Sequence, residues 1–195
     1  MIVVGLAGRA GCGKSAVARR LSERDDVVWV DLDPVAWTTY APGTATHRAL
    51  VERFGIGIVA EDGSIDRRRL ADAVFVDEGA AADLDRLVHP AVVRALESIR
   101  AEEEKRGTRV LLVEGALLAS SDAVDRSTFD VIVWMDVDET VRRTRLRAAG
   151  RLDHAERSDR LRPAPGVLQV DAAGSIDTVS QRLWTLVENL EREIR

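Results

Sequence analysis

Cysteine and lysine are both scarce in this chain of 195 residues, with one and two copies. The single cysteine, Cys12, cannot form a disulfide within the chain, which excludes a disulfide-stapled scaffold and is typical of the cytoplasm. Lysine occurs only at positions 14 and 105, and all other basic residues, of 28 in total, are arginine. A lysine kept at position 14 therefore indicates a site that requires a compact ammonium group rather than a planar guanidinium.

Long apolar runs and an excess of positive charge are also missing. Every apolar run has the length of a strand, so we expect no membrane-spanning segment. The opening MIVVGLAG lacks the basic start of a signal peptide and is expected to form a first strand. Acidic residues outnumber basic ones by 33 to 28, which gives a net charge of −5 and disfavours nucleic-acid binding. We therefore expect a cytoplasmic protein whose partners are neither nucleic acid nor membrane.

The chain does contain a regular alternation of short Val-rich runs with helical patterns. Strands are predicted at residues 2–7, 27–31, 109–114, 130–136 and 166–170. Helices are predicted at residues 14–24, in several pieces across 34–106, at 138–149 and at 175–194. This alternation predicts an α/β fold, a three-layer sandwich around a five-stranded parallel sheet.

No repeat or linker divides the chain, so we expect a single domain over residues 1–195. Its predicted core consists of residues 1–33, 107–141 and 164–195. The insert at about 34–106 is too polar and broken for a plain crossover and is expected to form a helical substrate cap. Residues of about 142–163 are expected to form a lid, and the segment at 150–166 is expected to be a mobile loop or a short helix.

A glycine-rich loop follows the first predicted strand. Gly8-Arg9-Ala10-Gly11-Cys12-Gly13-Lys14-Ser15 matches the phosphate-loop pattern G-x-x-x-x-G-K-[ST]. The glycines allow the backbone N–H groups to point inward around phosphate, and the following helix N-terminus adds positive charge. Lys14 is predicted to reach the β- and γ-phosphates of ATP, and the Ser15 hydroxyl to bind Mg²⁺. The pattern predicts a P-loop NTPase fold that binds a nucleotide through all eight residues.

Cys12 permits two interpretations. Its place beside Lys14 and a helix N-terminus favours a reactive thiol, while a small residue that only fills the loop is the simpler alternative.

Four further segments carry a family resemblance: VDLDPVA at 30–36, YAPGTATHRALVERFG at 40–55, EDGSIDRRRLADAVF at 61–75 and LDRLVHPAV at 84–92. In order and spacing they resemble dephospho-coenzyme A kinase, from the phosphate loop to about residue 140. The resemblance implies a P-loop kinase that transfers phosphate from ATP to the ribose 3′-hydroxyl of dephospho-coenzyme A, the last step of coenzyme A biosynthesis. It also implies that Asp33 and Lys14 are catalytic and that Asp33 and His89 contact the acceptor.

Structural alternatives exist for both acceptor-side residues. Asp33 precedes Pro34 and could serve only as a helix N-cap, and His89 could simply begin a helix with Pro90 at its first position.

The chain departs from the family pattern in three segments, one of which, VDAAGS at 170–175, lacks the asparagine that the family has near its C-terminus. VEGALL at 113–118 replaces the usual aspartate, apolar residue and proline, although Glu114 could still order Mg²⁺ through water. In the lid, Ala149 stands where the family has an arginine. Other lid arginines are expected to contact phosphate, with Arg145, Arg147 and Arg151 as candidates. If the lid helix continues, Arg143, Arg147 and Arg151 share one of its faces.

These departures leave two alternatives to the coenzyme A reaction. One is a related P-loop kinase that acts on a nucleoside or nucleotide, and the other is a nucleotide-binding regulator that has lost turnover. The expected assembly is a monomer or a small homo-oligomer.

Overall fold

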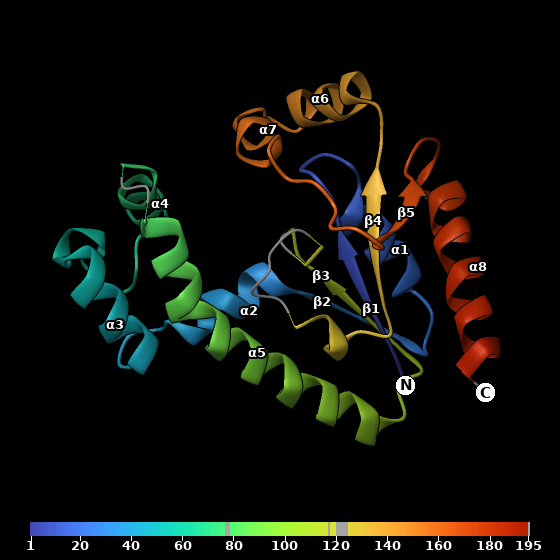
Figure 1. Cartoon of the computed structure of the whole chain (residues 1–195), viewed down its shortest axis with the longest axis horizontal. Coiled ribbons are helices and arrows are strands. Elements are labelled where there is room, and N and C mark those ends of the chain that lie inside the picture. The colour runs from blue at the N-terminus through green and yellow to red at the C-terminus, as the bar shows by residue number, and fades with distance from the viewer. Residues whose placement is uncertain (77–78, 117, 120–124, 195) are drawn as a thin grey trace. The chain divides into compact units, whose positions relative to one another are not determined.

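The computed structural model describes residues 1–76, 79–116, 118–119 and 125–194 (Figure 1). The strands are β1 (Ile2–Ala7), β2 (Val27–Asp31), β3 (Val110–Glu114), β4 (Val131–Asp136) and β5 (Leu168–Asp171). The helices are α1 (Lys14–Leu21), α2 (Leu32–Thr39), α3 (Ala45–Phe54), α4 (Arg67–Val76), α5 (Ala80–Arg106), α6 (Glu139–Ala148), α7 (Asp153–Ser158) and α8 (Ile176–Ile194).

The chain divides into two compact units. One consists of residues 1–31 together with 102–195, and the other consists of residues 32–101. The single kinase domain with a cap and a lid stays a prediction.

The first unit contains a five-stranded sheet of parallel strands in the order β2-β3-β1-β4-β5. The order confirms the predicted α/β class, because neighbouring parallel strands are joined through crossover helices. The carboxyl ends of β1 and β3 meet at one edge of the sheet, since Leu6 lies beside Glu114 in the register. Ligands of open α/β sheets bind at this edge, and the phosphate loop starts there.

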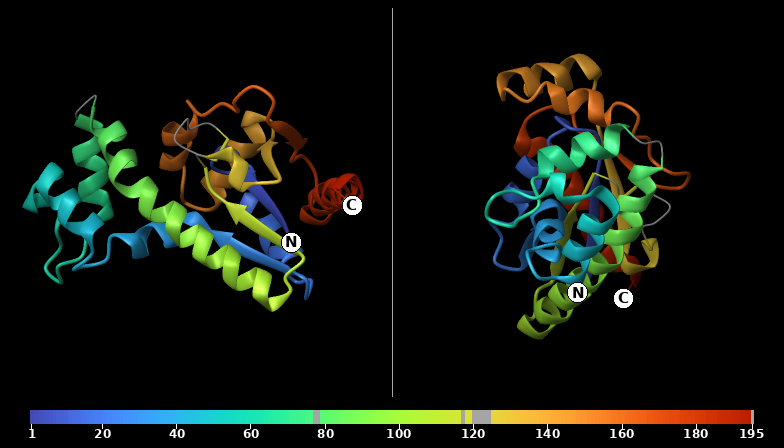
Figure 2. Two further views of the ribbon diagram at one scale, coloured as in Figure 1. Left: turned by 60° about the horizontal axis from the view of Figure 1, so that its bottom comes forward. Right: turned by 90° about the vertical axis from the view of Figure 1, so that its left-hand side faces the viewer.

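Helices α1 and α8 lie side by side against one face of the sheet (Figures 1 and 2). The two helices share a core with the sheet, in which Val17, Leu21, Leu183 and Val187 are buried against strand residues such as Leu112. Burial of such side chains stabilises the fold by roughly 1.5–3 kcal/mol each. This packing fixes the start of α1, and with it the end of the phosphate loop.

The second unit is helical and has its own small core of Tyr40, Leu50, Ile58, Ile65 and Leu70. The Thr44 hydroxyl caps α3 by accepting a bond from the His47 N–H at 3.1 Å, and the Asp66 carboxylate caps α4. Such caps typically contribute about 1 kcal/mol each.

Both structural alternatives for the acceptor-side residues are wrong. Helix α2 begins at Leu32, so Asp33 lies inside its first turn and is not the N-cap residue. Helix α5 runs through Pro90, so His89 lies inside a long helix rather than at its start.

Helix α6 confirms the helix predicted at residues 138–149 to within one residue at each end, and the short helix α7 follows it. Helix α6 ends at Ala148, and Gly150 has a left-handed φ of 65°. Glycine adopts this conformation without the steric cost that other residues incur. Arg151 therefore lies beyond α6, so the condition under which residues 143, 147 and 151 would share one helix face is not met. Within the part of the chain that the structure describes, every helix is too short or too polar to traverse a bilayer.

Candidate active site

The phosphate loop connects β1 to α1, and three glycines determine its path. Gly8, Gly11 and Gly13 have φ values of 144°, 82° and 106°, in the region that disfavours side chains. A Cβ atom on Gly8 would also lie 2.5 Å from the Met135 carbonyl oxygen at the end of β4. The loop therefore tolerates only glycine at these positions.

The Lys14 side chain folds back across this loop. Its Nζ donates to the Gly8 carbonyl oxygen at 2.8 Å and approaches that of Arg9 at 3.4 Å. Lys14 is also the first residue of α1, whose opening N–H groups lack acceptors within the helix. An ammonium group and a helix N-terminus therefore converge on the loop, which is the arrangement that binds phosphate.

Ser15 and Glu114 form the second part of the site. The Ser15 hydroxyl donates to Glu114 Oε1 at 2.7 Å, which joins the start of α1 to the end of β3. Burial raises the pKa of Glu114 above its ordinary value, while the Ser15 hydrogen bond and the Lys14 charge act in the opposite direction. A buried carboxylate of this kind is stabilised by additional positive charge.

The donor set fits a magnesium ion. The Trp29 indole N–H lies close enough to Glu114 to lower the pKa of that carboxyl, but Glu114 Oε2 has no hydrogen-bond partner of normal geometry among the described residues. A hydroxyl and a carboxylate both offer the hard oxygen ligands that Mg²⁺ prefers. Because Mg²⁺ usually retains several water ligands, one or two protein ligands are enough for a site. Among the described residues, no three His, Cys, Asp or Glu side chains cluster as a metal site. The Ser15 hydroxyl and the Glu114 carboxylate are candidate ligands for this ion because they are adjacent oxygen donors beside the phosphate loop.

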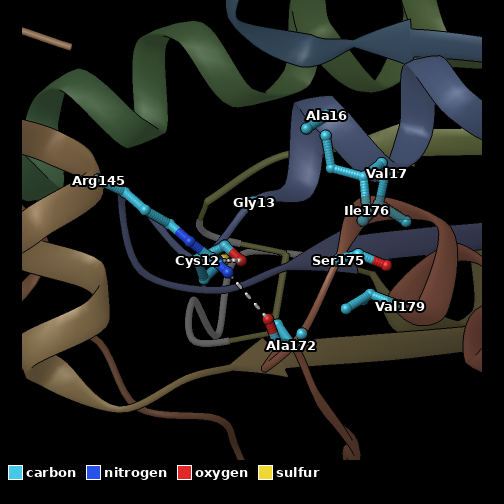
Figure 3. Close-up of a pocket in the computed structure, with 10 residues that line it drawn as sticks. Cys12, Gly13, Ala16, Val17, Arg145, Ala172, Ser175, Ile176 and Val179 are labelled. Carbon is cyan, nitrogen blue, oxygen red and sulfur yellow. Dashed lines mark hydrogen bonds between the residues drawn. The ribbon is translucent and has the colours of Figure 1, made fainter. Parts of the chain in front are cut away.

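A cavity of about 350 Å³ lies beside the loop (Figure 3). It is lined by Cys12 and Gly13 of the loop, by α1, by Arg145 of α6 and by the segment that leads from β5 into α8. Arg145 donates to the Cys12 carbonyl oxygen at 3.1 Å and to that of Ala172 at 3.4 Å. Its guanidinium thus spans the cavity between the loop and the carboxyl end of the sheet (Figure 3).

The remaining candidates of this unit lie in different environments. Arg9 pairs with Asp136 at 3.0 Å. Cys12 is buried, which favours its interpretation as a residue that fills the loop. Arg147 and Arg151 are exposed, at the end of α6 and in the turn after it.

The acceptor-side candidates lie in the second unit. Asp33 is exposed, and burial raises the pKa of the neighbouring Tyr40, on which the charges of Arg67 and Asp33 also act. Arg67 stacks over the Trp37 ring, with its guanidinium carbon 3.6 Å from the ring centroid. His89 lies near Asp85 on α5, and burial raises the pKa of Asp85. Asp33, Tyr40 and Arg67 thus form one cluster.

Two members of this second unit were not singled out in the sequence. Arg67 belongs to the IDRRRL run, and this run could have been recognised as a charged site because it follows a capping aspartate. Trp37 offered no such signal, since a tryptophan in a helical pattern is usually a core residue.

Comparison with known proteins gives a consistent assignment. Residues 2–163 match the model of the dephospho-CoA kinase family. The dephospho-CoA kinase of Geobacter sulfurreducens is 34% identical over 191 residues, which cover 94% of this chain and 95% of the relative. That of Thermobifida fusca is 31% identical, over 100% of this chain and 98% of the relative.

Solved structures share the fold. A crystal structure from Thermus thermophilus has a TM-score of 0.69 at 24% identity, over 97% of each chain. The dephospho-CoA kinase from Campylobacter jejuni has a TM-score of 0.62 at 14% identity, over 99% of this chain and 98% of that one. On the family model and the sequence relatives together, the chain belongs to the dephospho-CoA kinase family.

Proposed function

We propose that this protein transfers the γ-phosphoryl group of ATP to the ribose 3′-hydroxyl of dephospho-coenzyme A. The observation that carries the proposal is the grouping of Lys14, Ser15 and Glu114 around a glycine loop, in a chain of this family. In the reaction the 3′-oxygen bonds to the γ-phosphorus, the bond from that phosphorus to the β-bridging oxygen breaks, and ADP leaves. Little covalent chemistry is required of the protein, so positioning and charge dominate.

Each residue around the loop has a defined task. The loop of residues 8–15 and the Lys14 ammonium are proposed to bind the phosphates of ATP, through the loop amides other than those of Ala10 and Cys12, which already donate to Ser158 and Arg9. Ser15 would hold Mg²⁺ directly, and Glu114 would hold it through water. When bound, this ion supplies positive charge to the β- and γ-phosphates.

The cavity beside the loop suits the base and ribose of ATP. It is largely apolar and continuous with the loop, and Arg145 lies along it. Arg147 and Arg151 are exposed and are proposed to contact the phosphates during transfer.

The second unit supplies the acceptor side. Asp33 is proposed as the base that orients the 3′-hydroxyl and receives its proton. His89 and the stacked pair of Trp37 and Arg67 are proposed to contact the acceptor, because an indole face and a guanidinium suit an adenine ring and a phosphate. A cytoplasmic location and a monomer or small homo-oligomer complete the proposal.

A product assay tests this function. The protein is incubated with Mg-ATP and either dephospho-coenzyme A, nucleosides or nucleoside monophosphates, and the products are identified by mass. Phosphorylation of dephospho-coenzyme A alone supports the proposal. Turnover of another acceptor in its place identifies a related kinase, and ATP binding without any turnover identifies a regulator.

A further inference from the structure

The lid carries a charged residue that is completely buried. Arg142 of α6 has no exposed side-chain surface, and its Nη2 pairs with Asp159. Its Nη1 donates to the Ala10 carbonyl oxygen of the phosphate loop at 3.2 Å. Burying a guanidinium costs several kcal/mol unless partners compensate, so these specific partners are required for it to remain in place.

Ser158 of α7 bonds the same loop residue from its other side. Its buried hydroxyl oxygen accepts from the Ala10 N–H at 3.1 Å and from Arg142 Nη1 at 3.4 Å. Both backbone groups of Ala10 are thus satisfied by lid side chains that lie 132 and 148 residues further along the chain. No regular secondary structure of the loop itself provides these bonds.

The lid also packs directly on the next residue. A Cβ atom on Gly11 would lie 2.8 Å from the Arg142 carbonyl oxygen and 2.7 Å from Leu146 Cγ. One turn of α6 further along, Arg145 bonds to Cys12. Three consecutive loop residues, Ala10 to Cys12, therefore contact α6 or α7.

We propose that Arg142 and Ser158 are positioning residues, which hold Ala10 and so keep the phosphate loop in the shape that binds ATP. The inference rests on the proposed kinase function and adds a part of the lid that does not touch the substrates. Fixing Ala10 leaves the N–H groups at the start of α1 directed to the phosphates, and it holds Arg145 against the same loop. The lid and the loop then act as one binding element.

Amide hydrogen exchange tests the contact in the protein without ligands. In Ser158→Ala the Ala10 N–H loses its acceptor, and we expect its exchange to become about tenfold faster while amides of β3 keep their rates. Arg142→Gln removes the buried charge but retains an amide donor, and it provides a second variant. Arg143→Gln is the matched control, because Arg143 also pairs with Asp159 but does not contact Ala10.

Kinetics test the consequence. Ser158→Ala and Arg142→Gln should each raise the KM for ATP about three- to tenfold and leave the KM for dephospho-coenzyme A unchanged. The control variant Arg143→Gln should have the KM values of wild type. Wild-type values of Ala10 exchange and ATP affinity in both variants would overturn the proposal, and faster exchange throughout the sheet would do the same. If Ala10 exchange and ATP binding respond but dephospho-coenzyme A is never phosphorylated, the positioning role stands and the proposed reaction is wrong.

Discussion

Asp33 is proposed to accept the proton of the acceptor hydroxyl, and its position in the fold allows that role to be tested separately from a structural one. It lies in the first turn of α2 rather than at the N-cap, and its side chain is exposed. Its charge near a helix N-terminus stabilises the helix by only about 0.3–1 kcal/mol. A variant that removes the charge therefore tests catalysis with little effect on folding.

We expect Asp33→Asn to lower kcat by at least about two orders of magnitude, because the amide cannot accept the proton of the hydroxyl. Its ATP affinity should remain that of wild type, since Asp33 belongs to the acceptor-side unit. Steady-state kinetics and calorimetric ATP titration provide the measurements, with the exposed Asp72→Asn as a control. A kcat within a few-fold of wild type would remove Asp33 from the mechanism.

The ionised carboxylate of Glu114 is expected to lower the stability of the fold while supporting magnesium-dependent turnover. Because burial raises its pKa above the ordinary 4.5, the folded protein binds this proton more tightly than the unfolded chain does. This carboxylate therefore destabilises the fold as pH rises through the window between the ordinary and the raised pKa. The penalty is complete above that window and absent below it.

Glu114→Gln should accordingly have a higher melting temperature than wild type at neutral pH without magnesium, and the difference should vanish in acid. The same variant should lose at least about tenfold in Mg²⁺-dependent turnover, comparable to one hydrogen bond to a charged group. Thermal melts at several pH values and rates at varied Mg²⁺ test both effects. The exposed Glu104→Gln is the control, and a Glu114→Gln protein that melts below wild type at neutral pH would contradict the argument.

Among the elements, α6 determines which lid arginines contact the phosphate loop. Arg145 projects from its middle and bonds to both sides of the cavity, whereas Arg147 and Arg151 lie at its end and beyond it. The predicted helix end at residue 149 already separated Arg151 from the other two, but spacing alone could not show that Arg145 bonds to the loop while Arg147 is exposed.

We expect Arg145→Ala to raise the KM for ATP about tenfold with a smaller change in kcat, since the bonds to Cys12 and Ala172 shape the site before chemistry begins. Initial rates at varied ATP measure the effect. Arg160→Ala removes an exposed arginine of the same lid and serves as the control. Equal KM values for the two variants would exclude Arg145 from the nucleotide site.

The sequence was sufficient for the elements that depend on local pattern. The five strands appear within two residues of their predicted starts, because Val-rich runs bounded by turn residues leave few alternatives. The P-loop was equally clear, since its glycines are required by backbone geometry. Helix ends were predicted less evenly. The end of α6 lies within one residue of its predicted position, whereas Pro90 lies within α5 although a proline usually marks a boundary.

The contacts of Arg142 with Ala10 and of Trp37 with Arg67 could not be predicted. Each contact joins segments that are distant in the sequence, and the identity of an arginine or a tryptophan does not indicate which residue it will contact. A buried arginine in particular contradicts the usual rule that arginine is exposed. Tertiary packing determines which side chains meet in such contacts, and the local sequence pattern does not indicate how distant segments pack.

At the scale of the whole molecule, ligand binding should appear as added stability. A ligand present at a hundredfold excess over its Kd stabilises the native state by about 2.7 kcal/mol. For a chain of this length that corresponds to a rise of about 5–10 °C in melting temperature. We therefore expect Mg-ATP to produce such a shift at a concentration well above its Kd.

Lys14→Ala should remove most of the shift at the same nucleotide concentration and should abolish turnover, since the phosphates lose their main side-chain countercharge. Lys105→Ala is the matched control, because it removes the only other lysine of the chain. Differential scanning fluorimetry measures both variants. A wild-type shift in Lys14→Ala would contradict the assignment of the phosphate loop.

The stacked pair on α2 and α4 has a further, optical consequence. Trp37 is the only one of four tryptophans within residues 32–101, and 42% of it is exposed, whereas Trp134 and Trp184 are almost completely buried. An exposed indole emits at longer wavelength than a buried one, and a guanidinium 3.6 Å from its ring centroid makes that emission sensitive to any molecule that displaces it. The acceptor-side unit thus contains its own fluorophore, and the difference between the spectra of wild type and Trp37→Phe isolates its signal from the rest of the chain.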